Sequence, residues 1–448
     1  MTGPDAPGPV PLLGSREAIA ITVGIVIGAG IFKAPSLVAG ASDGPGTMLL
    51  AWLLGGAISI VGALCYGELA SAYPGPGGDY RYLVRAYGGR VGFLYGWARL
   101  AIIQTGSVAL LAYVFGDYMA SVLPGGAAVY AALAVAGLTA LNWLGLRAGT
   151  TTQNWLVVVE VLGLVVVIVA GLFFAPALPA QAAVPASASG GGALGLVLVF
   201  VLLTYGGWSE AVYVSAELRD APRRMWRVLV IGLGAVTALY LLVNLAYLRG
   251  LGLAGMAGSD AVAADLMRRV AGPAGAALIA GAVAIAALTS ANATIFTGAR
   301  SSFALGRDVP ALAWLGRWDD ARATPGNALL VQGAAALLLV AAGAVARDGF
   351  RLAVEYTAPV FWLFFLANGV ALFVLRAREP GVPRPFRVPL YPVLPLVFCL
   401  SNAWLLWSSL AYTGWGALVG VAVLVTGALM LPWIDPARHL DLAKETAP

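Results

Sequence analysis

The stretch GIVIGAGIFKAPS, residues 24 to 36, interrupts the first long apolar segment of the chain. Each glycine inside a helix costs about 1 kcal/mol relative to alanine, and here a lysine and a proline follow three glycines. The apolar run from residue 18 to residue 32 would be about 23 Å long as a helix, which is shorter than the hydrocarbon core of a bilayer, about 30 Å. A helix that crosses a membrane here must therefore contain a break.

The composition of the chain is typical of a membrane protein with many spans. Its 448 residues are 60% hydrophobic and 10% charged, and the mean hydropathy is +0.88. This much apolar surface points to a lipid bilayer as the surroundings. The net charge of +5 comes from basic residues dispersed in short loops, a pattern that indicates membrane topology and no nucleic-acid-binding patch. The N-terminus lacks the features of a cleaved signal peptide and is expected to be a cytoplasmic tail.

The residue types that many enzymes and metal sites use are scarce. The only histidine, His439, lies in the polar C-terminal tail, and the two cysteines, Cys65 and Cys399, each lie in an apolar run. Histidine-based catalysis, a zinc site and a disulfide framework are therefore not expected. The sequence also lacks the G-x-x-x-x-G-K-[ST] pattern that binds ATP. We predict a protein that is not an enzyme, with no catalytic residue, no metal and no cofactor.

Apolar runs of about 20 residues are expected to cross the membrane twelve times. They cover residues 16–41, 46–73, 91–122, 126–147, 151–174, 193–218, 225–250, 273–305, 326–346, 352–376, 391–412 and 415–434. A cytoplasmic N-terminus places twenty of the 26 lysines and arginines on the cytoplasmic side and five outside, with Lys33 inside a span. This asymmetry predicts a multi-pass protein of the cell inner (cytoplasmic) membrane with both termini in the cytoplasm.

The sixth apolar segment is interrupted like the first, because Gly206 and Gly207 are followed in mid-span by Ser209 and Glu210. The two interruptions begin two stretches of five spans each, 16–174 and 193–376. Because five is odd, the second stretch enters the membrane from the opposite face, and interrupted spans at matching positions of such an inverted repeat indicate a transporter substrate site. The remaining parts are expected to be a cytoplasmic tail at 1–15, an external loop at 175–192, two additional spans at 377–434 and a cytoplasmic tail at 435–448.

The direction of each half-helix predicts what the breaks bind. The first span runs outward, so its second half points the free N–H groups of Ala29, Gly30 and Ile31 at the break, where they suit a carboxylate. The sixth span runs inward, and its first half ends in carbonyl groups that suit an ammonium group. The expected carbonyls are those of Leu203 and Thr204, together with Val26 and Ile27 of the first span. The pattern predicts an α-amino acid site; the alternative is a pair of glycine-packed helix crossings without a ligand.

Five segments along the chain carry motifs of a known family. They are GAGIFKAPSLVA, YGELASAYPGPGGDYRYLVRAYG, YGGWSEAVYVSAELRDAPRRM, TSANATIFTGARSSFALGRDVP and RPFRVPLYPVLP. In these segments the chain resembles the amino acid–polyamine–organocation superfamily, in the branch of the L-type amino acid transporters. The resemblance implies a LeuT-type fold of twelve helices with alternating access. It also implies that Gly28, Ala29 and Gly30 hold the substrate carboxylate, that Val26, Leu203 and Gly206 lie near the amino group, and that Ser209 and Asn292 border the pocket.

Two features depart from the family's pattern. Aligned with its relatives, the fifth span has Glu160 where many of them carry a lysine that takes the place of a sodium ion. The loop SVLPGGA after the third span lacks the cysteine with which animal relatives bind a single-span glycoprotein. No disulfide-linked heavy chain is therefore expected.

Charged residues within a span cost several kcal/mol and need a reason. Lys33 either reaches the surface or pairs with an acid, or it contacts the substrate. Glu210 is either stabilised at the start of a half-helix, or faces the pocket, where it selects a cationic side chain or takes up a proton. For Glu160 three roles stay open: a proton carrier, a counter-ion to a helix break and a sodium ligand. Glu68 and Asp79, which flank the loop PGPGGDYRYL, are expected to pair with its arginines.

The sequence thus predicts a secondary active transporter of amino acids that works by alternating access, through sodium-independent exchange or proton-coupled uptake. Two alternatives stay open. One is an amino-acid-sensing transceptor with little flux, and the other is a transporter of polyamines or other cationic amines. A membrane enzyme is disfavoured, because the chain lacks a metal or histidine constellation and a convincing pair of nucleophile and base.

Overall fold

Helices form along the long apolar runs, because a helix satisfies its own backbone hydrogen bonds where water is absent. The computed structural model describes residues 15–73, 78–145, 150–176, 192–209, 221–322, 324–346, 348–412 and 414–432. Over these ranges the regular structure is helical, with a single isolated bridge between Asp319 and Thr324. The predicted all-α class is therefore correct.

The helices follow the order of the predicted spans. The first half of the chain forms α1 (Ser15–Val26), η1 (Ala29–Phe32), α2 (Ala34–Gly40), α3 (Pro45–Ala72), α4 (Asp79–Tyr87), α5 (Gly89–Ala98), η2 (Arg99–Ile103), α6 (Gln104–Ala120), α7 (Ala127–Trp143), α8 (Thr150–Val169) and η3 (Ala170–Phe174). The second half forms α9 (Gly192–Thr204), α11 (Ala221–Ala257), α12 (Val262–Asp308), η4 (Pro310–Leu312), α13 (Gly326–Ala346), α14 (Gly349–Arg378), α15 (Val393–Tyr412) and α16 (Trp415–Met430). Each of the twelve predicted ranges overlaps at least one of these helices.

Seven helices in the described ranges are long and apolar enough to cross a membrane. They are Pro45–Ala72, Gly89–Ala120, Arg224–Ala257, Val262–Arg307, Gly326–Ala346, Gly349–Arg378 and Val393–Ala411. Shorter apolar helices are Ala127–Trp143, Val158–Phe174, Leu194–Thr204 and Trp415–Met430. The chain is therefore a multi-pass membrane protein, and the number of twelve crossings stays a prediction.

Glycines mark the points at which the two longest helices bend. Gly252 in α11 has φ 69° and Gly272 in α12 has φ 68°, in the left-handed region that favours glycine. The two bends lie close to residues 250 and 273, where the sequence predicts the end of the seventh span and the start of the eighth. The local pattern thus predicts where these helices change direction.

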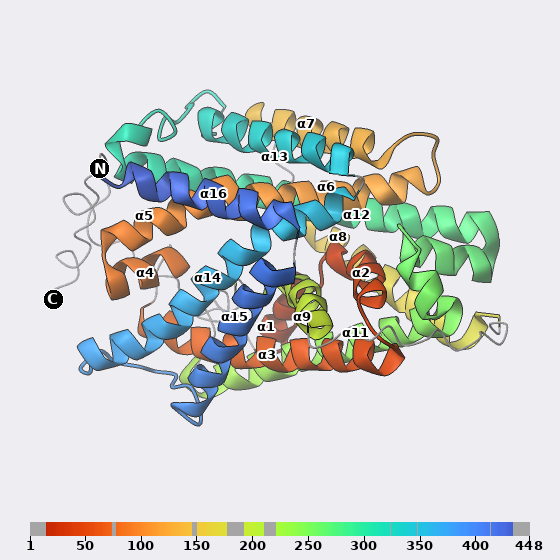
Figure 1. Ribbon diagram of the computed structural model, residues 1–448, viewed down its shortest axis with the longest axis horizontal. Helices are drawn as coiled ribbons and strands as arrows, with labels where there is room; N and C mark the ends of the chain where they lie inside the picture. Colours follow the sequence, from red (N-terminus) through yellow and green to blue (C-terminus); the bar gives the residue numbers. More distant parts are fainter. Residues whose placement is uncertain are drawn as a thin grey trace.

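The helices pack in two groups (Figure 1). The first group contains α1, α2, α3, α9 and α11, with α3 and α11 along the lower side of Figure 1. The second group contains α6, α7, α12 and α13, along the upper side. α8 contacts both α11 and α12, and α14 contacts both α3 and α6, so these two helices join the groups. Each group takes the corresponding segments from both halves of the chain.

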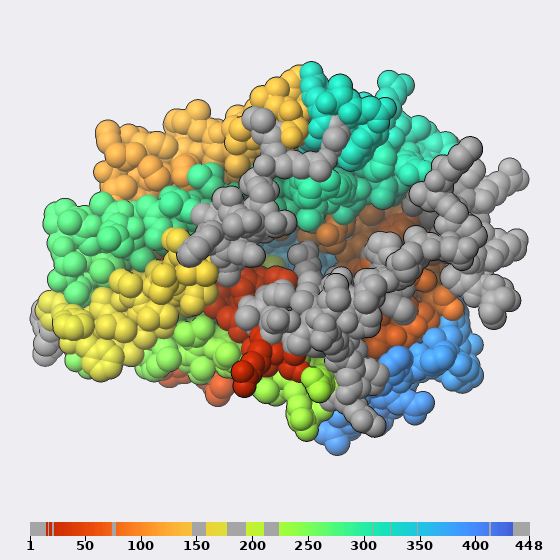
Figure 2. All heavy atoms as spheres, turned by 180° about the vertical axis from the view of Figure 1, so that it is seen from behind, coloured from red at the N-terminus to blue at the C-terminus, as the bar shows by residue number. Residues whose placement is uncertain are grey.

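Large apolar side chains cover much of the outer surface. Leu133, Leu278, Leu338 and Leu418, on four different helices, are each exposed. Figure 2 shows the face opposite to that of Figure 1, with red atoms of the first helices near its middle, below the orange and teal helices of the second group. An apolar exterior of this extent suits lipid and not water.

Candidate functional site at two helix breaks

The first break separates α1 from η1 at Ile27 and Gly28. Gly28 has an extended backbone, with φ −126° and ψ 169°. A Cβ atom placed on Gly28 would have no heavy atom within 4 Å, so open space adjoins the break. Pro35 lies in the first turn of α2, where its missing N–H costs little.

The amide groups that follow this break are only partly free. The N–H of Ile31 donates to the carbonyl oxygen of Gly28, at 3.3 Å. This amide is therefore bonded, in contrast to the sequence-based expectation of a free one. Among the described residues, no hydrogen-bond acceptor is found for the N–H groups of Ala29 and Gly30. These two amides remain as donors for an anion.

The second break follows α9 directly. Tyr205, Gly206 and Gly207 form a turn, after which Trp208 and Ser209 are helical again. The N–H of Gly206 donates to the carbonyl oxygen of Leu203, at 3.2 Å, so that carbonyl already accepts one hydrogen bond. Glu210 lies outside the described residues.

The two breaks touch each other. A Cβ atom on Gly207 would lie 2.3 Å from the carbonyl oxygen of Ile25, a distance that no side chain tolerates. Only glycine therefore lets the two backbones approach so closely at this point. A Cβ atom on Gly30 would lie 3.5 Å from Cγ2 of Thr204, in ordinary van der Waals contact. The structure thus brings together the residues that the sequence predicts at the two breaks.

A tyrosine that sequence reasoning missed joins the two breaks. The hydroxyl of Tyr240, on α11, lies 3.1 Å from the carbonyl oxygen of Val26 and 3.4 Å from that of Thr204. Its single proton serves one of them at a time, and each carbonyl keeps a lone pair for another donor. The ring of Tyr240 packs edge-on against Trp52, with ring centroids 5.5 Å apart, and against Tyr205 at 4.9 Å. In the sequence Tyr240 is one of two tyrosines in a largely aliphatic run, and nothing there singles it out.

Two other predicted residues lie differently with respect to the breaks. Ser209 is buried directly after the second break. Asn292, on α12, accepts a hydrogen bond at Oδ1 from Nδ2 of Asn142 on α7, at 2.7 Å. The Asn292 amide thus faces the second helix group, and no hydrogen bond found in the described residues joins it to either break.

Lys33 and Glu160 are both buried, but only Lys33 has a charged partner in the described ranges. The Nζ atom of Lys33 lies 2.8 Å from Oδ2 of Asp117, so pairing is observed and the lysine does not reach the surface. Glu160, on α8, is 6% exposed, and its Oε1 has no hydrogen-bond partner in the described part of the chain. Its carboxylate lies within electrostatic range of the Tyr240 hydroxyl. Glu160 thus has no charged partner in the described ranges, and its helix α8 contacts α11, which carries Tyr240.

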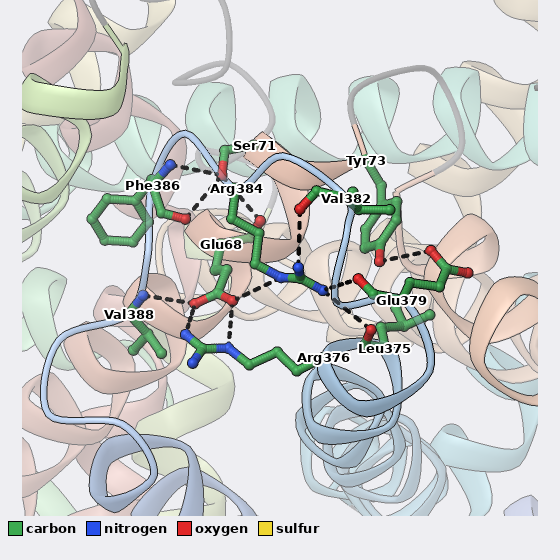
Figure 3. A network of polar contacts seen from close by, with 10 residues as sticks. All are labelled: Glu68, Ser71, Tyr73, Leu375, Arg376, Glu379, Val382, Arg384, Phe386 and Val388. Atoms are coloured by element: carbon green, nitrogen blue, oxygen red, sulfur yellow. Dashed lines mark hydrogen bonds and ion pairs between the residues drawn. The ribbon is translucent and has the colours of Figure 1, made fainter. Parts of the chain in front are cut away.

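A second polar cluster joins the end of α3 to the chain after α14 (Figure 3). Glu68 accepts hydrogen bonds from Arg376, at 2.6 Å and 2.5 Å, and from the N–H of Val388, at 2.7 Å. Nε of Arg384 lies 3.4 Å from the same carboxylate. Glu68 thus pairs with arginines of α14 and the following loop, where the sequence led us to expect those of the loop after α3.

The short helix α4 is attached at the same end of the molecule. Nε of Arg85 lies 2.8 Å from Oε2 of Glu379, and the carboxylate of Asp79 accepts a hydrogen bond from the hydroxyl of Tyr95, at 2.9 Å. The hydroxyl of Tyr87 donates to the carbonyl oxygen of Ala367 on α14, at 2.7 Å. Burial raises the pKa of Tyr87 to about 12, so this hydroxyl stays protonated and keeps its hydrogen bond.

Interrupted helices that meet inside a multi-pass helical membrane protein are typical of secondary transporters. The chain belongs to the amino acid permease family, whose model matches residues 13–431. This membership confirms the resemblance to the amino acid–polyamine–organocation superfamily.

Named relatives match over nearly the whole chain. The b(0,+)-type amino acid transporter 1 of Mus musculus is 28% identical over 428 residues, which cover 93% of this chain and 86% of that protein. The large neutral amino acids transporter small subunit 2 of Mus musculus is 30% identical over 432 residues, which cover 93% of this chain and 79% of that protein. Both are transporters, so the prediction that the chain is not an enzyme is confirmed.

Proposed function

We propose that this protein is a secondary active transporter that moves amino acids across the cytoplasmic membrane by alternating access. The observation that carries the proposal is the contact between two helix breaks of opposite polarity. The amides of Ala29 and Gly30, which have no acceptor among the described residues, lie on one side. Carbonyl groups of Val26 and Thr204, bridged by Tyr240, lie on the other. The amino acid transport activity of the relatives supports the same substrate class.

An α-amino acid carries the two charges that these groups complement. Amides at the start of a helical turn bind a carboxylate, and carbonyl oxygens accept hydrogen bonds from an ammonium group. The open space beside Gly28 provides room for the backbone of the substrate. The remaining members of the proposed pocket are Ile27, Ile31, Leu203, Gly206, Ser209 and Asn292.

We also propose the LeuT-type architecture of twelve crossings. The inverted repeats comprise residues 16–174 and 193–376, joined by an external loop at 175–192 and followed by two spans at 377–434, with cytoplasmic tails at 1–15 and 435–448. The two helix groups support this proposal, because α1 and α3 pack with α9 and α11, while α6 and α7 pack with α12 and α13. Alternating access then consists of relative motion of the two groups around the breaks.

The coupling of transport is assigned to Glu160 or Glu210. Glu160 is a candidate because it is buried, lacks a hydrogen-bond partner at Oε1 among the described residues and lies on α8, which contacts the helix of Tyr240. A proton, a sodium ion and a helix-break dipole each fit such a carboxylate. Lys33 is a weaker candidate for contact with substrate, since its ammonium group is engaged by Asp117.

We expect the protein to work without a disulfide-linked heavy chain. Its two cysteines, Cys65 in α3 and Cys399 in α15, are buried within helices. The loop between α6 and α7 contains no cysteine. Neither thiol is therefore available for a bond to a second chain.

The proposed function is tested with purified protein reconstituted into liposomes. Thermal-shift screening against amino acids and amines identifies a ligand, and labelled uptake of that ligand is measured at two pH values, with and without sodium. We expect an amino acid to bind and to be transported without sodium. Binding without flux favours the transceptor, and a response to polyamines alone favours an amine transporter. If no amino acid or amine binds or crosses the membrane, the proposal fails.

A further inference from the structure

Lys33 is enclosed by acidic groups from other parts of the chain. Its Nζ atom lies 2.8 Å from Oδ2 of Asp117 on α6, and 3.3 Å from Oδ1 and 3.1 Å from the carbonyl oxygen of Asp260, just before α12. The side chain of Lys33 is 4% exposed and that of Asp117 is 13% exposed, whereas Asp260 is 92% exposed. Lys33 is therefore buried, and Asp117 is largely shielded from water.

Tyr118, which follows Asp117 in α6, contacts Phe32, which precedes Lys33. The hydroxyl of Tyr118 donates to the carbonyl oxygen of Phe32, at 2.6 Å, and accepts a hydrogen bond from the N–H of Ala263 at the start of α12, at 3.2 Å. Two consecutive residues of α6, Asp117 and Tyr118, thus contact two consecutive residues where η1 meets α2, Lys33 and Phe32. Both contacts extend to the start of α12.

These contacts connect the two helix groups. Phe32 and Lys33 lie between α1 and α2, which pack in the first group, while η1 itself also contacts α6 and α12. Asp117, Tyr118 and the start of α12 belong to the second group. Phe32 ends η1, the turn that carries the amides of Ala29 and Gly30. The contacts thus lie directly beside the proposed carboxylate site, on the side of the break that leads away from α1.

A buried ion pair is suited to a contact that must open. Two buried charges lose hydration, so their attraction gives little net stability, whereas removal of one partner leaves the other uncompensated. When water enters, both charges regain hydration and their attraction weakens several-fold. The acid Asp348 also lies within electrostatic range of Lys33. Loss of the lysine charge therefore leaves Asp117 within electrostatic range of two other acids, Asp260 and Asp348.

We propose that Asp117 and Tyr118 form an outer clasp that closes the external entrance to the substrate site by holding Phe32 and Lys33. The clasp opens once in each transport cycle, when the two helix groups separate on that side. That the protein has a transport cycle, and that this entrance faces the outside, rest on the proposed function. That the entrance is closed rests on the contacts described above. Asp117 and Tyr118 are positioning residues, because they act through the first segment and not on the substrate.

The clasp is tested by the access of a thiol reagent to the breaks. A Gly28→Cys reporter is placed in full-length protein in which Cys65 and Cys399 are replaced by alanine. Right-side-out vesicles are then treated with a membrane-impermeant maleimide. We expect Asp117→Asn and Lys33→Met each to accelerate labelling from outside by about tenfold, because the open state becomes more populated. Tyr118→Phe, which keeps the ring and loses both hydrogen bonds, accelerates it by about threefold.

A matched control breaks an ion pair that does not connect the groups. Asp319→Asn removes the pair with Arg322, whose atoms are 3.4 Å apart on the surface, and leaves labelling unchanged. Unchanged labelling in folded Asp117→Asn and Lys33→Met proteins overturns the clasp, as does acceleration only from the inner side. If these two variants do not fold, Tyr118→Phe decides by the same criterion.

The labelling experiment needs no knowledge of the substrate. Faster labelling together with no flux of any amino acid supports the clasp and contradicts the proposed function. Amino acid flux together with unchanged labelling supports the proposed function and contradicts the clasp. The two failures are thus distinguishable.

Discussion

The hydroxyl of Tyr240 lies 3.1 Å from the carbonyl oxygen of Val26, at the point where the first helix ends. The same hydroxyl lies 3.4 Å from the carbonyl oxygen of Thr204, where α9 ends. One side chain of α11 therefore ties both breaks together. Because α1, α9 and α11 belong to one helix group, we expect this bridge to keep the site intact during the proposed motion of the groups.

Removal of the bridging hydroxyl tests this relationship. We expect Tyr240→Phe to lower the free energy of unfolding by about 1 kcal/mol, because a buried hydrogen bond is lost, and to weaken binding of the amino acid found by screening. The measurements are thermal unfolding and ligand titration. Tyr247→Phe is the matched control, since the Tyr247 hydroxyl on the same helix is buried with no hydrogen-bond partner in the described residues. Equal effects of both variants contradict the bridge.

The contact between the breaks depends on Gly207. We expect Gly207→Ala to abolish transport and lower thermal stability, because the new Cβ atom would lie 2.3 Å from the carbonyl oxygen of Ile25. Gly234→Ala is the control, since a Cβ atom there meets nothing within 4 Å, and alanine stabilises a helix by about 1 kcal/mol over glycine. Native transport by the Gly207→Ala protein shows that the breaks do not need this close contact.

The buried carboxylate of Glu160 is tested by its amide isostere. If Glu160 carries the coupled proton, uptake into liposomes rises as the external pH falls. The Glu160→Gln substitution then abolishes this dependence of uptake on pH. Glu160→Asp retains the acid and is expected to retain the dependence. An unchanged pH profile in the Glu160→Gln protein excludes the carrier role and leaves the counter-ion and the sodium ligand, which uptake with and without sodium separates.

The cluster around Glu68 makes a stability prediction. Glu68→Gln leaves Arg376 and Arg384 without the carboxylate that both contact, and loss of one partner of a buried pair costs about 3 kcal/mol. Glu379→Gln, at the half-buried pair with Arg85, should cost less than about 1 kcal/mol. Thermal unfolding of both variants measures the two losses of stability. Equal losses would contradict the prediction that the Glu68 carboxylate contributes more to stability than that of Glu379.

The helices and their breaks are predictable because they depend on local sequence. Apolar runs predict the helices, and the glycines at Gly28 and at Gly206 and Gly207 predict where the first and sixth segments are interrupted. These features need only a short window, since backbone hydrogen bonds and glycine preferences act over a few residues.

The partners of individual side chains are not predictable in this way. Tyr240 and Val26 are 214 positions apart, and Glu68 and Arg376 are 308 positions apart. No local pattern encodes such pairs, because they depend on how distant helices pack. For the same reason the sequence offers pairing with an acid as one of several alternatives for Lys33 and does not identify Asp117. The bonded amide of Ile31 depends on the exact turn of η1, which glycine spacing does not define.

The central claim is that the two breaks bind the carboxylate and the ammonium group of one amino acid. The most direct measurement is calorimetric titration of the purified protein with the amino acid found by screening, with its carboxamide and with its N-acetyl derivative. We predict binding of the free amino acid, loss of binding for both derivatives, and loss of binding in Gly30→Val, whose methyl groups fill the space towards Thr204. Equal binding of the three ligands, or native affinity in Gly30→Val, would contradict the claim.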